Sequence, residues 1–315
     1  MRVKLINVDS IIPNLALMQL SSYHKKLGDN VGFDVDKPDR VYVSCLFQDN
    51  ADLARGIVSM YPDSEVILGG SGFYNKDDLH NDLFTRTIPI EAQKVIPDYS
   101  LYPTMDYDIG FTTRGCFRNC PFCIVKAKEG NIHKWQHISE FHDPKHKEVH
   151  LLDNNIYGIK DWFFENTDYV IENGLKLKVH PGFDIRIITD EIATQLKRVK
   201  WGSNMLNFAW DNFSEKDEAK VIRGIDILKN AGFNLRSKIG FYVLVGFNTT
   251  PEQDLYRCEK LKSMGVNAFV MQYTKTPFTK HLARWSNRRQ LYWSMDFDQY
   301  KPAENVIKEI RIKEH

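Results

Sequence analysis

The sequence predicts an α/β protein, in which two series of parallel strands carry helices on their faces. Strand-like apolar runs alternate with amphipathic helical runs over the first ninety residues, and parallel sheets produce this alternation. A stretch with two prolines and little periodicity follows at residues 91–107. Six further strand-like runs come after it, most of them separated by helix-like runs. The chain therefore divides into two α/β parts joined by a linker.

The first series contains three strands and two helices. In chain order we expect them at residues 3–8, 14–27, 41–46, 49–61 and 65–68. Gly28 ends the first helix, as glycine commonly does. The third strand leads into Gly69-Gly70-Ser71-Gly72, whose backbone N–H groups could hold an anion. Short glycine runs are more often plain tight turns, which is the interpretation we favour here.

The second series contains the six remaining strands. We expect them at residues 108–113, 148–153, 175–180, 205–210, 237–245 and 267–272. A helix should begin after Ser214, where acidic residues follow a capping hydroxyl. Another should begin after Thr250, because Pro251 and Gln253 supply a first-turn proline and a capping-box partner. Periodicity alone supports a parallel α/β sheet in this part.

Composition limits the classes of protein that the chain can belong to. Its 315 residues suggest about two domains. The 42 basic and 41 acidic residues give a net charge of +1, so the whole chain has no electrostatic attraction for nucleic acid or an anionic membrane surface. No apolar run is long enough to span a bilayer, and the start lacks a signal-peptide core. We therefore expect a cytoplasmic protein without a membrane partner.

Three of the five cysteines lie within eight residues, at Cys116, Cys120 and Cys123. This spacing places three thiolates on one tight loop, close enough to converge on one metal centre. Iron–sulfur clusters take thiolate ligands, and a four-iron cluster normally needs four. A set of three leaves one iron open, which distinguishes a catalytic metal site from a closed structural one. The alternative is a zinc site completed by His133 or His137.

The cysteine loop resembles the CxxxCxxC motif of the radical S-adenosylmethionine (SAM) superfamily. That motif has an aromatic residue just before its last cysteine, where this chain has Phe122. The resemblance implies a 4Fe-4S cluster whose open iron chelates SAM. Reductive cleavage of SAM then gives methionine and a 5′-deoxyadenosyl radical, which abstracts hydrogen from a substrate. An electron donor such as flavodoxin or ferredoxin is implied as well.

The order of the two parts resembles one group within this superfamily. In that group a Rossmann-type, cobalamin-binding domain precedes a partial (β/α)6 barrel. The cobalamin version carries Asp-x-His-x-x-Gly, whereas Asp78-Leu79-His80 here lacks the glycine and follows the third strand, so we expect no cobalamin. The resemblance implies a degenerate Rossmann-like domain, a linker, a radical SAM barrel and a C-terminal extension, at residues 1–90, 91–107, 108–275 and 276–315.

Barrels of this type place their chemistry at the carboxyl ends of the strands. On this basis the resemblance implies six cofactor-binding residues: Phe122, Asp153, Asn155, Arg186, Asp211 and Gly246. Asp153, with Asn155 as a helper, would accept hydrogen bonds from the SAM ammonium group, unless it forms an Asx turn. Arg186 would pair with the SAM carboxylate. The alternative is an ion pair of Arg186 with Asp184 or Asp190.

The other three residues would contact the adenosyl part of SAM. Phe122 would lie against the adenine, and Gly246 would let the backbone approach it closely. Asp211 or Asn207 would reach the ribose hydroxyls, although the segment around them departs from the common Gly-x-Glu-Ser pattern. The resemblance assigns no catalytic side chain and no substrate, which leaves small molecules, peptides and nucleic acids open.

Two further segments carry alternative interpretations. Five histidines crowd residues 133–150; we expect a solvated surface there rather than a second metal site. Arginines interleave with aromatic residues at 281–293, where we expect arginine stems packed on rings, although such a segment could also bind RNA. The alternative function is a non-enzymatic zinc- or iron–sulfur-binding α/β module that senses redox state or docks RNA.

Overall fold

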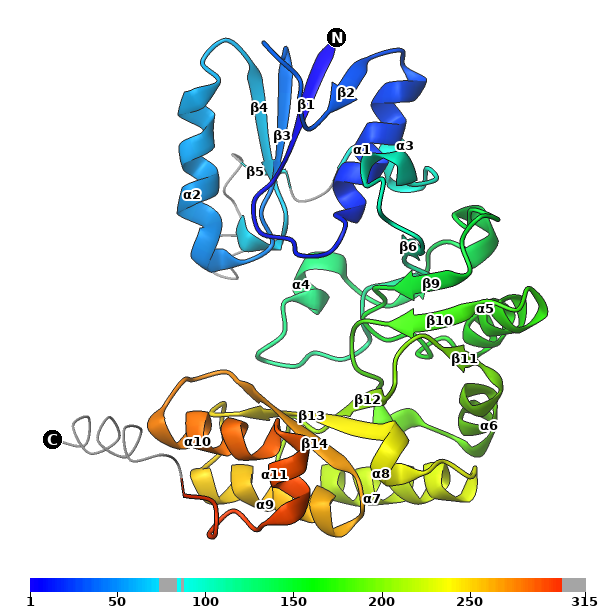
Figure 1. Cartoon of the computed structure of the whole chain (residues 1–315), viewed down its shortest axis with the longest axis vertical. Coiled ribbons are helices and arrows are strands. Elements are labelled where there is room, and N and C mark those ends of the chain that lie inside the picture. Colours follow the sequence, from blue (N-terminus) through cyan, green and yellow to red (C-terminus); the bar gives the residue numbers. More distant parts are fainter. Residues whose placement is uncertain (74–83, 86–87, 302–315) are drawn as a thin grey trace, which may run out of the picture. The chain divides into compact units, whose positions relative to one another are not determined.

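A computed structural model describes residues 1–73, 84–85 and 88–301 (Figure 1). Contacts divide the chain into two compact units. Unit 1 comprises Met1–Asn154 and Glu172–Lys178, and unit 2 comprises Asn155–Ile171 and Val179–His315. Unit 1 therefore contains the first strand series, the predicted linker and the cysteine loop. The domain bounds expected from the sequence stay predictions, and the Asp78–His80 segment lies outside the described residues.

Unit 1 is built on a five-stranded parallel sheet. Its strands lie in the order β2-β1-β3-β4-β5, and every neighbouring pair is parallel. In chain order they are β1 Arg2–Asn7, β2 Asn30–Gly32, β3 Arg40–Ser44, β4 Glu65–Gly69 and β5 Phe84–Thr85. Apolar side chains of β1 and β3 are buried because helices cover both faces of the sheet.

Helices lie on both faces of this sheet (Figure 1). α1 (Leu15–Lys26) packs Leu17 and Leu20 against the β1 side chains, and the Asn14 side chain caps it by accepting from the Leu17 N–H. α2 (Ala51–Gly56) packs on the other side with β3 and β4 and continues as a 3₁₀ turn. The helix expected at 49–61 is therefore only partly α-helical. α3 (Ile90–Gln93) adds one short turn beside α1.

The glycine loop after β4 is a tight turn, as predicted. The Gly72 N–H donates to the Cys45 carbonyl at 3.0 Å. Gly70 has φ +108°, and a Cβ there would lie 2.1 Å from the same carbonyl oxygen, so only glycine fits. Lys128 also reaches this loop and donates to the Ser71 hydroxyl at 2.7 Å.

The rest of unit 1 carries the cysteine loop. β6 (Asp108–Gly110) pairs in parallel with β9 (Glu148–Leu151), which also neighbours β10 (Lys176–Val179). The chain leaves β6 through an antiparallel ribbon of β7 (Thr113–Arg114) and β8 (His133–Lys134). The cysteine loop and α4 (Val125–Glu129) lie between the two ribbon strands. The strand expected at 108–113 is therefore two short strands.

Unit 2 contains a three-stranded parallel sheet. β13 (Ile239–Val245) lies between β12 (Leu206–Ala209) and β14 (Asn267–Gln272), and both pairings are parallel. Phe183 forms a single parallel bridge with Phe208 of β12. Of the six strands predicted from residue 108 onward, the five at 148–153, 175–180, 205–210, 237–245 and 267–272 all occur, with ends shifted by a few residues.

Helices cover one face of this sheet, as Figure 1 shows for α7 and α9. In chain order the helices are α5 Lys160–Glu172, α6 Asp190–Arg198, α7 Glu215–Asn230, α8 Leu235–Lys238, α9 Pro251–Ser263, α10 Pro277–Ser286 and α11 Arg289–Ser294, and the short β11 is Lys200–Trp201. The caps at Ser214 and Thr250 are confirmed, because each side chain accepts from the backbone three residues on. The buried sheet face includes Phe208, Phe241 and Val243.

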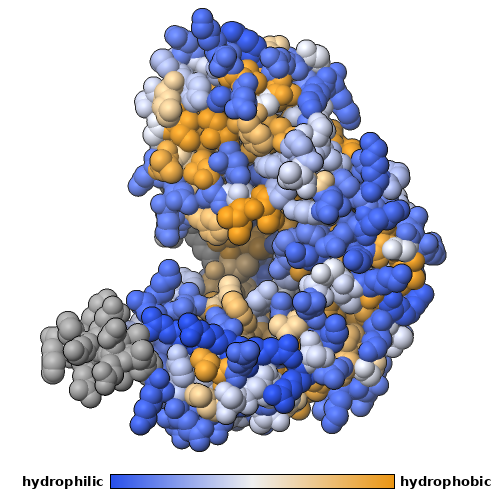
Figure 2. Space-filling view, in the orientation of Figure 1, coloured by the Kyte–Doolittle hydropathy of each residue, from blue (hydrophilic) through white to orange (hydrophobic). Residues whose placement is uncertain are grey.

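The predicted α/β class with parallel sheets is thus confirmed. The division into a Rossmann-like domain and a partial barrel stays a prediction. No helix within the described ranges combines the length and the apolar character that a bilayer crossing needs. Figure 2 shows that hydrophilic residues dominate the visible surface, with hydrophobic patches between them.

The packing of α7 gives a test of the fold. A Cβ on Gly224 would lie 2.5 Å from Ile185 Cγ1 and 2.9 Å from its carbonyl oxygen. We expect Gly224→Ala to lower the free energy of unfolding by about 1–3 kcal/mol through this clash, although alanine is the better helix former. The measurement is urea unfolding followed by circular dichroism.

The control is Gly56→Ala at the end of α2, where a Cβ would meet nothing within 4 Å. This change should raise the free energy of unfolding by about 0.5–1 kcal/mol. Stabilisation by both variants would contradict the close packing of α7 on Ile185.

Candidate functional site

The three clustered cysteines lie on the loop between β7 and α4. All three are half-buried, and none of them forms a disulfide within the described part of the chain. The Cys123 N–H donates to the Cys120 carbonyl at 3.0 Å, which closes a tight turn. The Arg118 N–H lies 3.4 Å from the Cys116 sulfur, and hydrogen bonds of this kind tune sulfur ligands of iron–sulfur clusters. The loop thus offers three accessible thiols, one of them supported by a backbone donor.

Gly115 shapes the start of this loop. Its φ is +75°, and a Cβ would lie 2.4 Å from the Asn131 carbonyl oxygen. The next residue, Cys116, donates its N–H to the Gly130 carbonyl at 3.2 Å. The outgoing and returning chains therefore approach closely where the first cysteine begins, and only glycine permits this approach.

Glu129, which the sequence did not single out, joins the two ends of the loop. Its carboxylate accepts from the Gly115 N–H at 3.0 Å and from the Asn154 side chain at 2.8 Å. It also pairs with Arg114 at 2.9 Å. Because a carboxylate offers several acceptor positions, one side chain holds three separate segments together.

Asp153 holds the strand that leads into the loop. It is 1% exposed, and it accepts from the backbone N–H and the hydroxyl of both Thr112 and Thr113, at 2.5–3.1 Å. Burial raises the pKa of this carboxyl, against the lowering effect of its threonine donors. Asp153 therefore anchors the cysteine loop, and its predicted contact with the SAM ammonium group stays a prediction.

The chemistry of the cysteine loop fits a thiolate-bound metal centre. Three cysteines without disulfides occur on one loop, and the half-buried Phe122 occupies the position before the last of them. Among the described residues, no three His, Cys, Asp or Glu side chains are gathered around a point that could hold a metal ion. The fit therefore rests on the identity of the three sulfur donors and on their spacing along the chain.

The expectation of a solvated histidine surface is wrong for three of the five histidines. His142 and His146 each place Nδ1 on the fully buried Asp108 carboxylate, at 2.5 and 2.7 Å. His150 is buried, lies 2.9 Å from Glu148 and stacks on a tyrosine ring. Buried histidines of this kind need a polar partner. The sequence showed that these histidines are close along the chain, but it did not show that Asp108 binds two of them.

Of the other two histidines, His133 is exposed as expected, and His137 is half-buried. The rings of the arginine–aromatic segment are packed into the protein, whereas the packing of the segment's own arginine stems on rings stays a prediction. Trp285 and Tyr292 are fully buried with ring centroids 5.0 Å apart, and the Arg236 guanidinium lies 4.3 Å from the centroid of the Trp293 ring. These rings are occupied by packing.

Three of the predicted SAM contacts in unit 2 gather around Asp184. The Asn155 Nδ2 lies 3.5 Å from Asp184 Oδ2, and the Arg186 Nε donates to Asp184 Oδ1 at 2.8 Å. Asp184 also caps a 3₁₀ turn by accepting from the Arg186 N–H. The ion pair with Asp184, one alternative for Arg186, is therefore present. Asp211 belongs to the same cluster, because the charges of Asp184 and Arg186 both act on its carboxyl.

Asp211 follows β12 and has an altered acidity. Burial raises its pKa to about 6, with a further rise from the charge of Asp184. The positive charges of Arg186 and Arg257 act in the opposite direction, and the Leu244 N–H donates to the carboxylate. A carboxyl group with a pKa near neutrality, set among other charges, is a common feature of ligand and catalytic sites.

Two buried polar atoms near these residues lack partners within the described part of the chain. One is Asn155 Oδ1, on a side chain that is 5% exposed, and the other is Trp210 Nε1, next to Asp211 in sequence. More than nine-tenths of buried polar atoms in proteins are hydrogen-bonded. An open acceptor and an open donor therefore mark this cluster as a place where a polar ligand or water would bind.

Gly246 begins the loop after β13. Its φ is +74°, and a Cβ would lie 3.2 Å from the Thr274 carbonyl oxygen. The Gly246 N–H donates to Asp254 Oδ2 at 3.0 Å, and the Thr249 hydroxyl donates to Asp254 Oδ1 at 2.6 Å. The loop is thus held from α9, and the absence of a side chain at Gly246 lets Thr274 approach its backbone closely.

The sheet face opposite the helices in unit 2 is apolar and open. Phe269, Met271 and Tyr273 alternate along β14 and just beyond it, with exposures of 44%, 45% and 56%. The ring of Tyr273 meets that of Phe247 at 4.7 Å. Alternate residues of a strand share one face, so this surface can receive a planar or apolar group.

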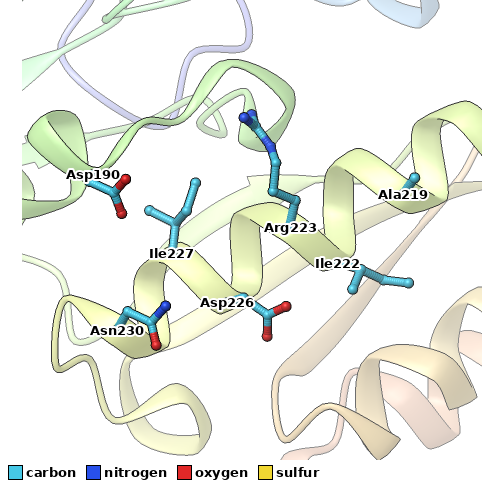
Figure 3. Close-up of a pocket in the computed structure, with 7 residues that line it drawn as sticks. All are labelled: Asp190, Ala219, Ile222, Arg223, Asp226, Ile227 and Asn230. Carbon is cyan, nitrogen blue, oxygen red and sulfur yellow. The ribbon is translucent and has the colours of Figure 1, made fainter.

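A separate open groove runs along α7 (Figure 3). Its volume is about 690 Å³, and its lining consists of Asp190, Ala219, Ile222, Arg223, Asp226, Ile227 and Asn230. The Arg223 guanidinium donates to the Ile188 carbonyl at 3.3 Å. None of the residues singled out for cofactor binding lines this groove.

The structure therefore groups the predicted site residues by unit. In unit 1 the loop with Cys116, Cys120, Phe122 and Cys123 is anchored through Asp153. In unit 2 the remaining contacts, Asn155, Arg186, Asp211 and Gly246, lie in the Asp184 cluster or on the loop after β13. Comparison with models of known protein families and with curated proteins gave no match.

Asp153 provides a test of how the loop is anchored. An asparagine at position 153 has the shape of aspartate but no charge. Its NH₂ group would face the N–H and hydroxyl donors of Thr112 and Thr113. We expect Asp153→Asn to lower the free energy of unfolding by about 1–3 kcal/mol, measured by urea unfolding with tryptophan fluorescence. The exposed Asp36→Asn should change it by less than about 0.5 kcal/mol. Equal stability of both variants would refute the anchoring role.

Asp211 provides a test through pH. Its folded pKa of about 6 exceeds the value of about 3.9 for an unperturbed aspartate. As pH rises, the unfolded chain loses this proton first, so ionisation of Asp211 removes stability between about pH 4 and 6 and none above. The stability of Asp211→Asn relative to the natural protein should therefore increase over that window and then level off. A constant difference from pH 4 to 7 would show that the Asp211 pKa is not raised.

Proposed function

We propose that the chain is a radical SAM enzyme. The observation that carries the proposal is the loop with Cys116, Cys120 and Cys123, whose spacing and preceding aromatic, Phe122, resemble the superfamily motif. When bound, a 4Fe-4S cluster would supply the electron that cleaves SAM to methionine and a 5′-deoxyadenosyl radical, which takes hydrogen from a substrate. The protein would supply the ligands, the positioning and the exclusion of water.

The three thiolates would hold the cluster and leave one position open for SAM. The absence of a disulfide among the three cysteines supports this role, because the thiolate is the form of cysteine that binds metal. The carboxylates of Glu129 and Asp153 fix the two ends of the segment. Such support keeps a ligand loop in position whether or not the metal is bound.

The polar cluster of unit 2 has groups suited to the amino-acid part and the ribose of SAM. The open Asn155 Oδ1 and the carboxylates of Asp184 and Asp211 can accept from ammonium or hydroxyl groups. Arg186 can pair with a carboxylate while its Nε stays on Asp184. Asp211 would accept as an anion above its pKa of about 6.

The loop at Gly246 and the open sheet face would suit the adenine. A glycine backbone lets a flat ring approach closely, and the apolar side chains at Phe269 and Met271 offer a surface for stacking. We further propose a degenerate Rossmann-like domain without cobalamin, followed by a partial barrel. Flavodoxin or ferredoxin would donate the electron, in the cytoplasm, where thiols stay reduced. The substrate class follows from none of these residues.

Substitution of each cysteine tests the proposal. After anaerobic reconstitution with iron and sulfide, the natural protein should form 5′-deoxyadenosine from SAM and dithionite, measured by mass spectrometry. Cys116→Ala, Cys120→Ala and Cys123→Ala should each abolish this product, because three ligands are the minimum for the proposed cluster. Product formation by any of the three variants would refute the assignment.

The matched control is Cys258→Ala. Cys258 is fully buried, and burial raises the pKa of its thiol to about 12, so it cannot serve as a thiolate ligand. This variant should keep its iron and its product. A colourless natural protein that retains zinc instead of iron would favour the alternative metal-binding module.

A further inference from the structure

A buried ion pair lies on α9 behind the strand ends of unit 2. Arg257 is 0% exposed and Asp254 is 1% exposed, and the Arg257 Nη2 lies 2.6 Å from Asp254 Oδ1. The two residues are three apart on one helix and therefore adjacent on its surface. Their remaining hydrogen bonds all lead to segments of the candidate site.

Arg257 joins the ends of two neighbouring strands. Its Nη1 donates to the Trp210 carbonyl at 2.8 Å, and its Nη2 donates to the Leu244 carbonyl at 2.7 Å. Trp210 follows β12 directly and precedes Asp211, while Leu244 is near the end of β13. The planar guanidinium fixes both carbonyls at once, which a lysine ammonium on a flexible stem cannot reproduce.

Asp254 fixes the loop that continues from β13. Its two carboxylate oxygens accept from the Gly246 N–H at 3.0 Å and from the Thr249 hydroxyl at 2.6 Å. The same carboxylate also holds Arg257. One ion pair therefore determines where the β12 end lies and where the Gly246 backbone lies.

Stability alone is a poor explanation for this pair. Burying two charges costs more than their attraction commonly returns, and the Arg257 Nε–H has no hydrogen-bond partner in the described part of the chain. Apolar residues of similar volume would serve a structural purpose equally well. The arrangement is explained instead by what the pair holds.

Arg257 also acts on the charge of Asp211. Three charged groups act on that carboxyl: Asp184 and Arg186 from the 3₁₀ turn and Arg257 from α9. The neutral Leu244 N–H donates a hydrogen bond to it as well. Arg257 favours the ionised form of Asp211, and Asp184 opposes it. Arg257 thus contributes both to the position of the segment that carries Asp211 and to its charge.

We propose that Asp254 and Arg257 are positioning residues for the ligand site at the carboxyl ends of β12 and β13. Arg257 fixes the end of β12 that carries Asp211, and Asp254 fixes the backbone at Gly246. Both residues are buried, so they would act through Asp211 and Gly246 rather than by touching the ligand. The identity of the ligand as SAM rests on the proposed function, whereas the action of the pair on Asp211 does not.

The first experiment measures Asp211 in the ligand-free protein. Carboxyl ¹³C NMR, assigned with Asp211→Asn, gives its pKa in the full chain. Arg257→Gln removes a positive charge, so the Asp211 pKa should rise above that of the natural protein. Asp254→Asn removes a negative charge near Arg257, so the Asp211 pKa should fall or stay constant. Shifts of both variants in the same direction, or none in Arg257→Gln, would overturn the proposal.

Arg257→Lys covers the case in which Arg257→Gln does not fold. It keeps the charge but cannot hold two carbonyls and a carboxylate in one plane. The Asp211 pKa should then stay near its value in the natural protein, although the Trp210 and Leu244 carbonyls lose their shared donor. Because lysine keeps the positive charge, a raised Asp211 pKa in Arg257→Lys would show that the charge of Arg257 is not the cause of its effect on Asp211.

The second experiment measures SAM binding to the cluster-loaded protein by equilibrium dialysis across pH 5–8. Asp254→Asn and Arg257→Lys should each weaken binding by about tenfold or more, as expected when supporting residues are lost. The control is Leu261→Ala, which removes a fully buried side chain of the same helix. It should lower stability and leave SAM affinity unchanged.

The outcomes separate the two claims. If the natural protein binds no SAM, the proposed function fails, while the NMR titration still decides whether the pair controls Asp211. If the natural protein binds SAM and Asp254→Asn and Arg257→Lys bind it equally well, the positioning role fails and the proposed function stands. Equal losses in Leu261→Ala and the two pair variants would also reject positioning, because general destabilisation would then explain them.

Discussion

The rest of the structure depends on aspartate and glutamate carboxylates that accept hydrogen bonds from backbone N–H groups. Asp153 holds the segment entering the cysteine loop, Glu129 joins its two ends, and Asp254 holds the loop after β13. A charged acceptor with several backbone donors forms stronger bonds than a neutral one, and these segments have few ladder bonds of their own. The cysteine loop and the loop after β13 are thereby fixed in place without being part of a sheet.

Much of the fold could be predicted from the sequence because its parallel strands are apolar runs bounded by turns. The first three strands and the caps at Ser214 and Thr250 were found within a few residues. The edge strand Asn30–Gly32 was missed, since three residues without an apolar run give no periodic signal. The second expected helix changes to 3₁₀ after Gly56, a residue that weakens helices. Its exact ending depends on packing rather than on periodicity.

The site was predictable only where its signal is local. The spacing of the cysteines, the aromatic before the last of them and the glycine at 246 can all be read along the chain. Asp184 was named from the sequence as a partner of Arg186, two residues away. Glu129 and the Asp254–Arg257 pair were not found, because they act on segments that the folded chain brings near. The histidines show the same limit, because their crowding was visible while the buried Asp108 that holds two of them lies more than thirty residues away.

Electron paramagnetic resonance of the reconstituted, dithionite-reduced protein tests the central claim most directly. A cluster held by Cys116, Cys120 and Cys123 with one open iron should give a signal of a reduced 4Fe-4S centre, and added SAM should change its g values. A protein that gives no such signal, or a signal that SAM leaves unchanged, would contradict the account.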